Sequence, residues 1–309
     1  MNTNYTEIQK EYTNWLDTLG FSNGLVYDYK FRVRDFLEWL QTQGVSKINQ
    51  LTDKHIKTYF DYLQIRSNKR KKAGLSVSHL NHNFCAIDKL MEFLHQMGME
   101  TAPTPTNYRL KVDKQLRINN IEPFTQQEIK ILHANITNTY PHFTFIQKEA
   151  KQEQLKLIFA LYYACGLRRT EGYKLTVQDI DFDKRTIFVR QGKNYKDRIV
   201  PMNKGVYKAL QHYIYNFRNL QKVNHKRLFI HHTNALSRSL KELQQTTQIY
   251  AEQSRSNQVI KQKRLSLHIL RHSIATHLLQ NGMSIENIAQ FLGHSTLNST
   301  QIYTHIINK

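Results

Sequence analysis

Residues 267–305 read LHILRHSIATHLLQNGMSIENIAQFLGHSTLNSTQIYTH, and they hold the clearest structural signals in the chain. Apolar residues recur every three or four positions at the start, which predicts a helix over about 268–280. Gly282 and Ser284 then provide a helix stop and an N-cap, so we expect a short helix over 285–292. Gly293 ends that helix, and a third helix is expected over 296–305.

The same stretch carries polar residues with chemical potential. His268 and Arg271 lie three positions apart, so on a helix both can face one ligand. Arginine binds phosphate oxygens through a planar fork, and histidine exchanges a proton near neutral pH. His294 follows Gly293, and Tyr303 lies nine residues further on. The helix–turn–helix outline alone also fits a repressor-like module that reads the major groove of DNA, in which Tyr303 is only a core aromatic residue.

Upstream, residues 165–171 read CGLRRTE after a predicted helix over 148–166. Taken alone, they indicate a helix end whose basic residues favour the helix dipole. Two strands, 186–190 and 198–200, are predicted around a polar turn at 191–197 that contains Lys193. Further helices are expected over about 126–136, 204–222 and 235–250.

The first hundred residues predict a four-helix bundle, with helices over about 5–19 and 53–65 and helical patterns over 29–40 and 80–94. Between the helices over 53–65 and 80–94 lies a run of basic residues that can contact phosphates. This run comprises Arg66, Lys69, Arg70, Lys71 and Lys72. A segment with two prolines follows, Pro103 and Pro105, which cannot continue a helix. We therefore expect three parts: a helical domain over 1–100, an extended linker over 101–122 and a second domain over 123–309.

Composition narrows the classes of function. The 309 residues carry a net charge of +20, from 44 basic and 24 acidic residues. Residues 1–122 contribute 17 basic and 13 acidic residues, so +16 falls on the remainder. Such a charge favours nucleic acid as the partner. The longest apolar run, 157–167, is about half a membrane span, and the first residues do not resemble a secretory signal. Two cysteines fit a reducing compartment, so we expect a cytoplasmic protein with no membrane partner.

Taken in order, these motifs are G-L-R-x-x-E, a lysine in a strand turn, H-x-L-R-H, L-G-H and a tyrosine after eight further residues. Together they resemble the tyrosine recombinase (integrase) family, with detailed likeness over about 122–309. The stretch 292–305 looks especially similar to Xer-type enzymes and related mobile-element integrases. The resemblance implies a mainly α fold with a small β-sheet: an N-terminal helical core-binding bundle with a SAM-like fold and a C-terminal α+β catalytic domain.

The resemblance also implies a role for each motif residue. Tyr303 is the expected nucleophile, which attacks a DNA phosphate and leaves a 3′-phosphotyrosyl link. The other implied catalytic residues are Arg168 and Arg271 as phosphate clamps, Lys193 as general acid, His268 as an aid to proton transfer at the tyrosine and His294 as a phosphate contact. Glu171 is expected to support the site without reacting. Phosphoryl transfer of this kind needs charge stabilisation that two guanidinium groups and a lysine can supply, so no cofactor or metal is expected.

The implied partner is double-stranded DNA with paired recombination sites, bound by a homotetramer or together with a paralogous recombinase. Two features depart from the family pattern. Cys165 stands where a small polar residue is usual, and only six residues follow Tyr303, which leaves the coupling between protomers open. The chain also begins with the helical bundle, so we expect it to lack the arm-binding domain of larger phage integrases.

Three alternatives stay open at this point. One is a non-catalytic helix–turn–helix regulator, and another is a type IB topoisomerase-like strand breaker. A metal-dependent nuclease is the third, and it would use His268, His272, His277 and His294. Glu286 is the only carboxylate after residue 260, so this histidine set lacks the acidic ligands that such a site usually has.

Overall fold

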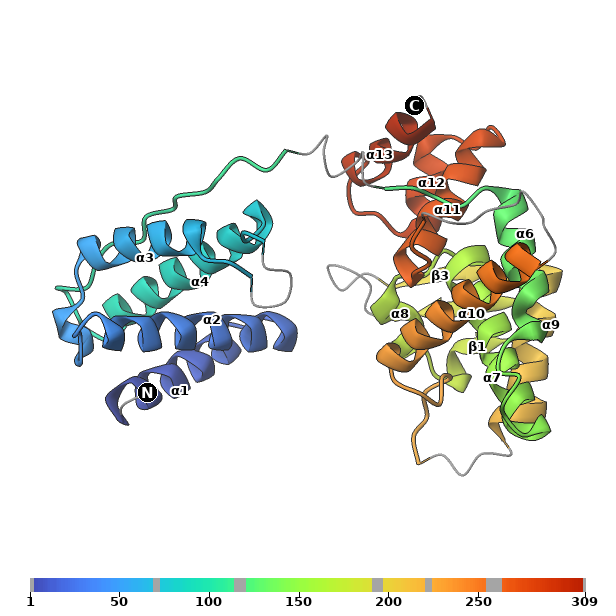
Figure 1. The fold of residues 1–309 in the computed structure, drawn as a ribbon, viewed down its shortest axis with the longest axis horizontal. Coiled ribbons are helices and arrows are strands. Elements are labelled where there is room, and N and C mark those ends of the chain that lie inside the picture. The colour runs from blue at the N-terminus through green and yellow to red at the C-terminus, as the bar shows by residue number, and fades with distance from the viewer. Residues whose placement is uncertain are drawn as a thin grey trace. The chain divides into compact units, whose positions relative to one another are not determined.

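The computed structural model describes residues 3–68, 73–113, 121–190, 197–219, 224–253 and 263–307. The chain forms two compact units, Met1–Asp113 and Lys114–Lys309, each with its own hydrophobic core (Figure 1). The prediction of a mainly helical protein with one small sheet is confirmed. In the described ranges, no helix is both long and apolar enough to cross a membrane.

The N-terminal unit is the predicted four-helix bundle. Its helices are α1 (Thr3–Thr18), α2 (Asn23–Thr42), α3 (Asp53–Ile65) and α4 (Val77–Gln96), with a 3₁₀ turn at Ile48–Gln50. Serine side chains cap the N-termini of α2 and α4: Ser22 accepts a hydrogen bond from the backbone N–H of Leu25, and Ser76 accepts one from that of His79. The apolar faces of all four helices meet in one core, which buries Phe36 and Phe84 completely.

Residues 97–113, the described part of the segment directly after α4, form no helix or strand, as the prolines predicted, but they are not free of the bundle. The buried carboxylate of Asp88 accepts hydrogen bonds from the backbone of Thr106 at 2.8 Å and of Asn107 at 3.2 Å. It also forms an ion pair with Arg109 at 2.7 Å. The predicted linker began at residue 101; the structure differs, because these contacts attach residues 106–109 to α4 and the first unit extends to Asp113.

The C-terminal unit opens with α6 (Gln126–Ala134), a 3₁₀ turn (Asn135–Asn138) and α7 (Phe145–Ile158), which continues as a π-helix (Phe159–Ala164). Next come α8 (Arg169–Lys174), a 3₁₀ turn (Val177–Asp179) and the sheet. The remaining helices are α9 (Lys204–His212) with a π-helical end (Tyr213–Arg218), α10 (Thr233–Gln253), α11 (Leu267–Gln280), α12 (Ile285–Leu292) and α13 (Asn298–Ile307).

The sheet has three antiparallel strands in the order β1 (Ile180–Asp181), β2 (Thr186–Val189) and β3 (Arg198–Pro201). Val189 of β2 pairs with Arg198 of β3, so the connection that contains Lys193 starts and ends at this pair. The two longer strands were predicted, whereas β1 is only two residues long and gave no recognisable pattern.

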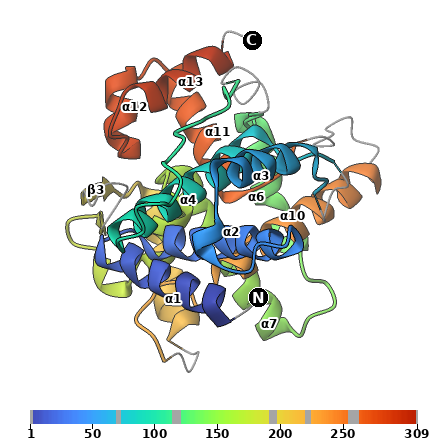
Figure 2. The same cartoon turned by 90° about the vertical axis from the view of Figure 1, so that its left-hand side faces the viewer.

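The last three helices pack on one another at one end of the C-terminal unit, as both views show (Figures 1 and 2). A small apolar cluster of Ala275, Ile288, Leu292 and Tyr303 joins them. Gly282 has a φ of 84° and ends the turn after α11, and the Ser284 side chain caps α12. The predicted bounds of this helix, 285–292, are therefore confirmed.

Candidate active site

The first part of the site is a sharp turn between the π-helix and α8. Gly166 has a φ of 58°, a left-handed conformation that favours glycine. A Cβ at this glycine would lie 2.8 Å from Leu292, so the turn also needs glycine for close packing. Arg168 then begins α8 instead of ending the preceding helix. Its backbone N–H donates to Glu171 at 2.8 Å, which caps the new helix.

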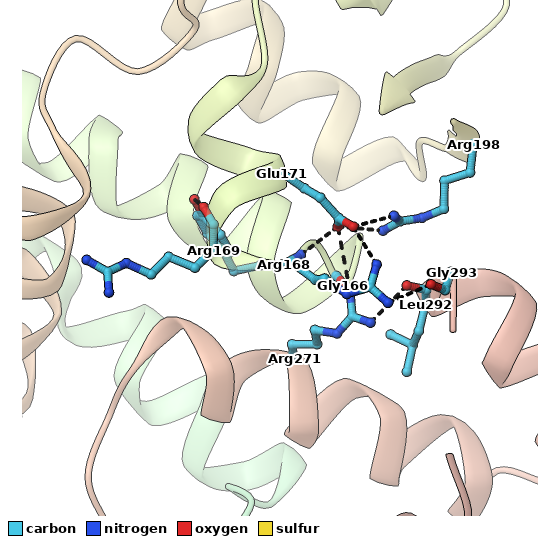
Figure 3. A network of polar contacts seen from close by, with 9 residues as sticks. Gly166, Arg168, Arg169, Glu171, Arg198, Arg271, Leu292 and Gly293 are labelled. Atoms are coloured by element: carbon cyan, nitrogen blue, oxygen red, sulfur yellow. Dashed lines mark hydrogen bonds and ion pairs between the residues drawn. The ribbon is translucent and has the colours of Figure 1, made fainter. Parts of the chain in front are cut away.

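Glu171 is the centre of the polar network in Figure 3. Its carboxylate accepts a hydrogen bond from the Arg168 guanidinium at 2.5 Å. Arg198, from the first position of β3, binds both carboxylate oxygens at 2.8 and 2.9 Å. Arg271, from α11, lies 3.8 Å from one of them. One buried carboxylate therefore gathers three guanidinium groups from three separate elements.

Backbone carbonyls fix the remaining orientations. Arg271 donates to the carbonyl of Gly166 at 2.6 Å and to that of Leu292 at 2.8 Å. Arg168 donates to the carbonyl of Gly293 at 2.5 Å. Both arginines thus bind the C-terminal end of α12, and the turn that follows it is held against them. Arg169, the neighbour of Arg168, points away from this network (Figure 3) and donates instead to Thr233 at the start of α10.

The electrostatics of the cluster keep Glu171 and Arg271 charged at neutral pH. Burial alone would raise the pKa of Glu171, but Arg198 and Arg168 outweigh it and lower the pKa to about 2. Burial and then the charge of Arg168 lower the pKa of Arg271 to about 10, still three units above neutrality. Three arginines and one glutamate leave two net positive charges in a largely buried place. Such a site attracts an anion strongly.

Tyr303 lies beside this cluster and is 1% exposed. Its hydroxyl is 3.1 Å from Nδ1 of His272, the residue after Arg271 on α11. Burial raises the pKa of Tyr303 to about 12, although Arg271 and Arg168 act in the opposite direction. The ring of His294 stacks near that of Tyr303, with centroids 6.5 Å apart.

His294 is held through its Nδ1 atom, which lies 2.7 Å from the hydroxyl of Thr300. Burial and the positive charges of Arg271 and Arg168 lower the pKa of His294 to about 3. The imidazole is therefore neutral at physiological pH. In the tautomer in which Thr300 donates to Nδ1, the proton lies on Nε2, so that His294 offers a neutral hydrogen-bond donor.

His268 lies one helical turn before His272, at the start of α11, and its side chain is exposed. It lines a cavity of about 580 Å³ together with Arg169, Arg264 and Ser266. Burial on one side and the charges of Arg271 and Arg169 lower its pKa. The histidine that contacts the tyrosine hydroxyl is thus His272 and not His268, which differs from the sequence-based interpretation.

The structure therefore brings five of the predicted residues together around one centre: Arg168, Glu171, Arg271, His294 and Tyr303. Lys193 and the basic residues Lys69, Arg70, Lys71 and Lys72 lie outside the described residues. Arg66 is described, at the C-terminal end of α3. No group of three or more His, Cys, Asp or Glu side chains that could hold a metal occurs in the described ranges.

Two residues, Arg198 and His272, were not predicted as members of a recombinase site, although His272 was named in the nuclease alternative. Arg198 could have been found from strand periodicity, because it shares a face with Val200, which is 1% exposed. A charged residue on the buried face of a strand requires a buried partner, here Glu171. His272 had no comparable signal, since its partner Tyr303 lies 31 residues away on another helix.

Residues 122–309 match the phage integrase family, and the chain therefore belongs to this family of tyrosine recombinases, which cleave and rejoin DNA through a phosphotyrosine intermediate. It is 27% identical to the tyrosine recombinase XerA of Pyrococcus horikoshii, over 98% of this chain and 90% of that protein. With the tyrosine recombinase XerC of Oceanobacillus iheyensis it shares 28% identity, over 92% of this chain and 87% of that protein.

Solved structures share the fold at lower identity. The XerH site-specific recombinase bound to its difH substrate matches with a TM-score of 0.64 and 16% identity, over 91% of this chain and 76% of that one. The Tn1549 transposon integrase in complex with circular intermediate DNA matches with a TM-score of 0.62 and 19% identity, over 96% and 94%. Membership in the family does not favour a non-catalytic regulator or a topoisomerase-like strand breaker.

Proposed function

We propose that this protein is a site-specific DNA recombinase that cuts one strand through Tyr303 and rejoins it to another. The observation that carries the proposal is the position of a buried tyrosine beside three arginines and one glutamate with two net positive charges. A phosphodiester carries one negative charge, and the transition state of its displacement carries a second on the oxygens around phosphorus. The charge of the cluster complements that transition state.

Arg168 and Arg271 are the proposed phosphate clamps. Each guanidinium group has five N–H donors, and only some of them bind Glu171 and the carbonyls of Gly166, Leu292 and Gly293. The protein contacts orient the two planar groups, and the remaining donors stay available for phosphate oxygens. Glu171 and Arg198 support the clamp, because Arg198 binds both oxygens of the carboxylate that orients Arg168.

The remaining roles follow from the family chemistry. His294, neutral at physiological pH, donates a hydrogen bond to the phosphate. Lys193 protonates the 5′-oxygen that leaves, and Lys196 is the next candidate for that task. The bond energy is kept in the phosphotyrosine, so a 5′-hydroxyl can attack it later and reseal the strand. This account uses no ATP and no metal.

We further propose that the protein works in the cytoplasm as a tetramer on two DNA sites, alone or with a paralogous recombinase. The N-terminal bundle is the proposed core-binding domain, and its basic residues 66–72 contact DNA phosphates. DNA complexes of the XerH recombinase and the Tn1549 integrase, which share the fold, support DNA as the partner.

A nicked suicide substrate tests the proposal. It loses the short 5′-hydroxyl strand after cleavage, so a covalent protein–DNA adduct accumulates and can be seen on a denaturing gel. Wild-type protein should form the adduct with and without EDTA, and Tyr303→Phe should form none. Tyr215→Phe is the matched control, because Tyr215 is 57% exposed and outside the site, and it should react normally.

Two results would contradict the proposal. An adduct that persists in Tyr303→Phe would place the nucleophile elsewhere, and cleavage that requires a divalent metal would indicate a nuclease. Recombination should also require two sites on the DNA, whereas a topoisomerase-like enzyme would act on one.

A further inference from the structure

We propose that His272 is the general base that takes the proton from Tyr303 during strand cleavage and returns it during rejoining. This inference rests on the proposed function, because it concerns the same nucleophile. It assigns a catalytic role to the last histidine of the H-x-L-R-H motif, for which the family resemblance implied none.

The geometry supports a direct proton transfer. Nδ1 of His272 lies 3.1 Å from the Tyr303 hydroxyl, which is hydrogen-bond distance, and the two ring centroids are 5.7 Å apart. The two residues come from α11 and α13, which pack against each other. His272 is half-buried and Tyr303 is buried, so the transfer takes place away from bulk water.

The chemistry of Tyr303 requires such a base. Burial raises its pKa to about 12 despite the nearby arginines. At pH 7 only about one hydroxyl in 10⁵ is then ionised, since each pH unit below the pKa reduces the phenolate tenfold. A neutral phenol is a weak nucleophile, and an adjacent base is the usual solution.

His294 and His268, the two other histidines predicted for the catalytic site, lie in different environments. His294 uses Nδ1 for Thr300 and has a pKa far below neutrality, so it is a poor proton acceptor. His268 is exposed at the first turn of α11 and lines the cavity with Arg169 and Arg264. Among the hydrogen bonds of the described residues, the histidine that reaches the Tyr303 hydroxyl is His272.

The proton balance is complete in both directions. As the tyrosine oxygen forms its bond to phosphorus, its proton moves to Nδ1 of His272, the bond from phosphorus to the 5′-oxygen breaks, and that oxygen takes a proton from the general acid. In rejoining, the 5′-hydroxyl returns its proton to the general acid as it attacks phosphorus, and the tyrosine oxygen leaves with the proton from His272.

Single-turnover adduct formation on the suicide substrate tests the inference. His272→Ala should slow it by about 10²–10⁴-fold, the usual contribution of a general base, with little loss of site binding. His272→Asn can still hydrogen-bond Tyr303 from a position close to Nδ1 but cannot take up a proton. It should be about as slow as His272→Ala. His142→Ala, which changes an exposed histidine outside the site, should react like wild type.

A fluorinated tyrosine at position 303 gives the decisive readout. A trifluorotyrosine ionises near neutral pH and needs no base, so it should restore adduct formation in His272→Ala to within about tenfold of wild type. It should not restore a variant whose defect is only structural. His268→Ala with trifluorotyrosine at position 303 is the variant with which the rescue of His272→Ala is compared.

A near-normal rate of adduct formation in His272→Asn would overturn the assignment. So would a fluorinated tyrosine that rescues His268→Ala but not His272→Ala. In either case, adduct formation by the wild-type protein would still support the proposed recombinase function. If wild-type protein formed no adduct through Tyr303, the proposed function would fail, and the role of His272 would fail with it. The two failures are therefore distinguishable by the wild-type lane alone.

Discussion

Glu171 shows how a single buried carboxylate can organise a cationic site. It is 3% exposed, and its two oxygens receive hydrogen bonds from Arg168 and Arg198. Without it, three guanidinium groups would repel one another in a place with little water to screen them. Glu171 thus allows the three guanidinium groups to lie close together, and in the proposed mechanism it does not itself react.

Removal of its charge should destabilise the fold in a pH-dependent way. The folded pKa of Glu171, about 2, lies below its ordinary value of 4.5. The carboxylate therefore contributes stability above about pH 4.5, and this contribution is lost as the pH falls through about 2. By linkage it amounts to about 3 kcal/mol. Denaturant unfolding of Glu171→Gln should show a deficit of this order at pH 7 that shrinks towards acidic pH. An equal deficit at pH 7 and pH 3 would exclude ionisation as its source.

Arg198 should matter for cleavage more than for binding. It holds Glu171 in a bidentate pair with only 12% of its side chain exposed, so Arg198→Ala should let Arg168 reorient. We expect the cleavage rate to fall by about 10²-fold, as for other losses of oriented charge in an active site, while site affinity changes little. Arg198→Lys should recover only part of the rate, because lysine cannot form the bidentate contact. Arg238→Ala, on the exposed side of α10, is the matched control; a parallel loss of affinity in Arg198→Ala would instead make it a DNA contact.

At the scale of elements, the turn between α12 and α13 connects the proposed phosphate clamp to Tyr303, the proposed nucleophile. Gly293 has a φ of 66°, and its carbonyl accepts the hydrogen bond from Arg168. A Cβ at this position would lie 2.9 Å from Cδ of Arg198. The C-terminal end of α12, Arg168 and Arg198 therefore all lie close to Gly293.

Gly282 provides a control for Gly293. It has a φ of 84°, yet a Cβ there would meet nothing within 4 Å. Gly282→Ala should cost about 1 kcal/mol of unfolding free energy, from backbone strain alone, and leave cleavage intact. Gly293→Ala should cost more and also reduce cleavage, because Arg198 must move. Thermal or denaturant unfolding of both variants, with the adduct assay, measures the difference, and equal behaviour would show that the contact with Arg198 is unimportant.

At the scale of the whole molecule, charge is divided unequally between the two units. Residues 1–113 carry 15 basic and 12 acidic residues, a net +3, whereas residues 114–309 carry 29 and 12, a net +17. Nonspecific attraction to phosphates should therefore reside in the C-terminal unit. The N-terminal unit should add position and specificity.

Separate expression of the two units tests this division, since each has its own core. Residues 114–309 alone should bind DNA weakly, with an affinity that falls steeply with salt. The full chain should discriminate better between a recombination site and random DNA. Gel shifts at two salt concentrations give both quantities. If residues 1–113 bound as tightly as the whole protein, the division of labour would be wrong.

Much of the architecture could be predicted because its signals are local. Ser284 and Gly293 bracket α12, and a cap or a left-handed glycine acts within one turn of helix. The boundaries of β2 and β3 were also predicted to within one residue, because a polar turn separates the two strands in the sequence. Residues 165–171 were misleading, because their basic residues suit a helix end, whereas in the structure Arg168 caps a new helix.

The sequence by itself determined the two-unit helical architecture, the family and the motif residues, since these depend on periodicity, caps and spacing along the chain. Only the tertiary structure decided which side chains meet. Arg198 reaches Glu171 across 27 residues, His272 reaches Tyr303 across 31, and Asp88 attaches a segment expected to be free. Such pairs depend on how separate elements pack against one another, and no pattern within a few residues of sequence predicts a contact between residues so far apart in the chain.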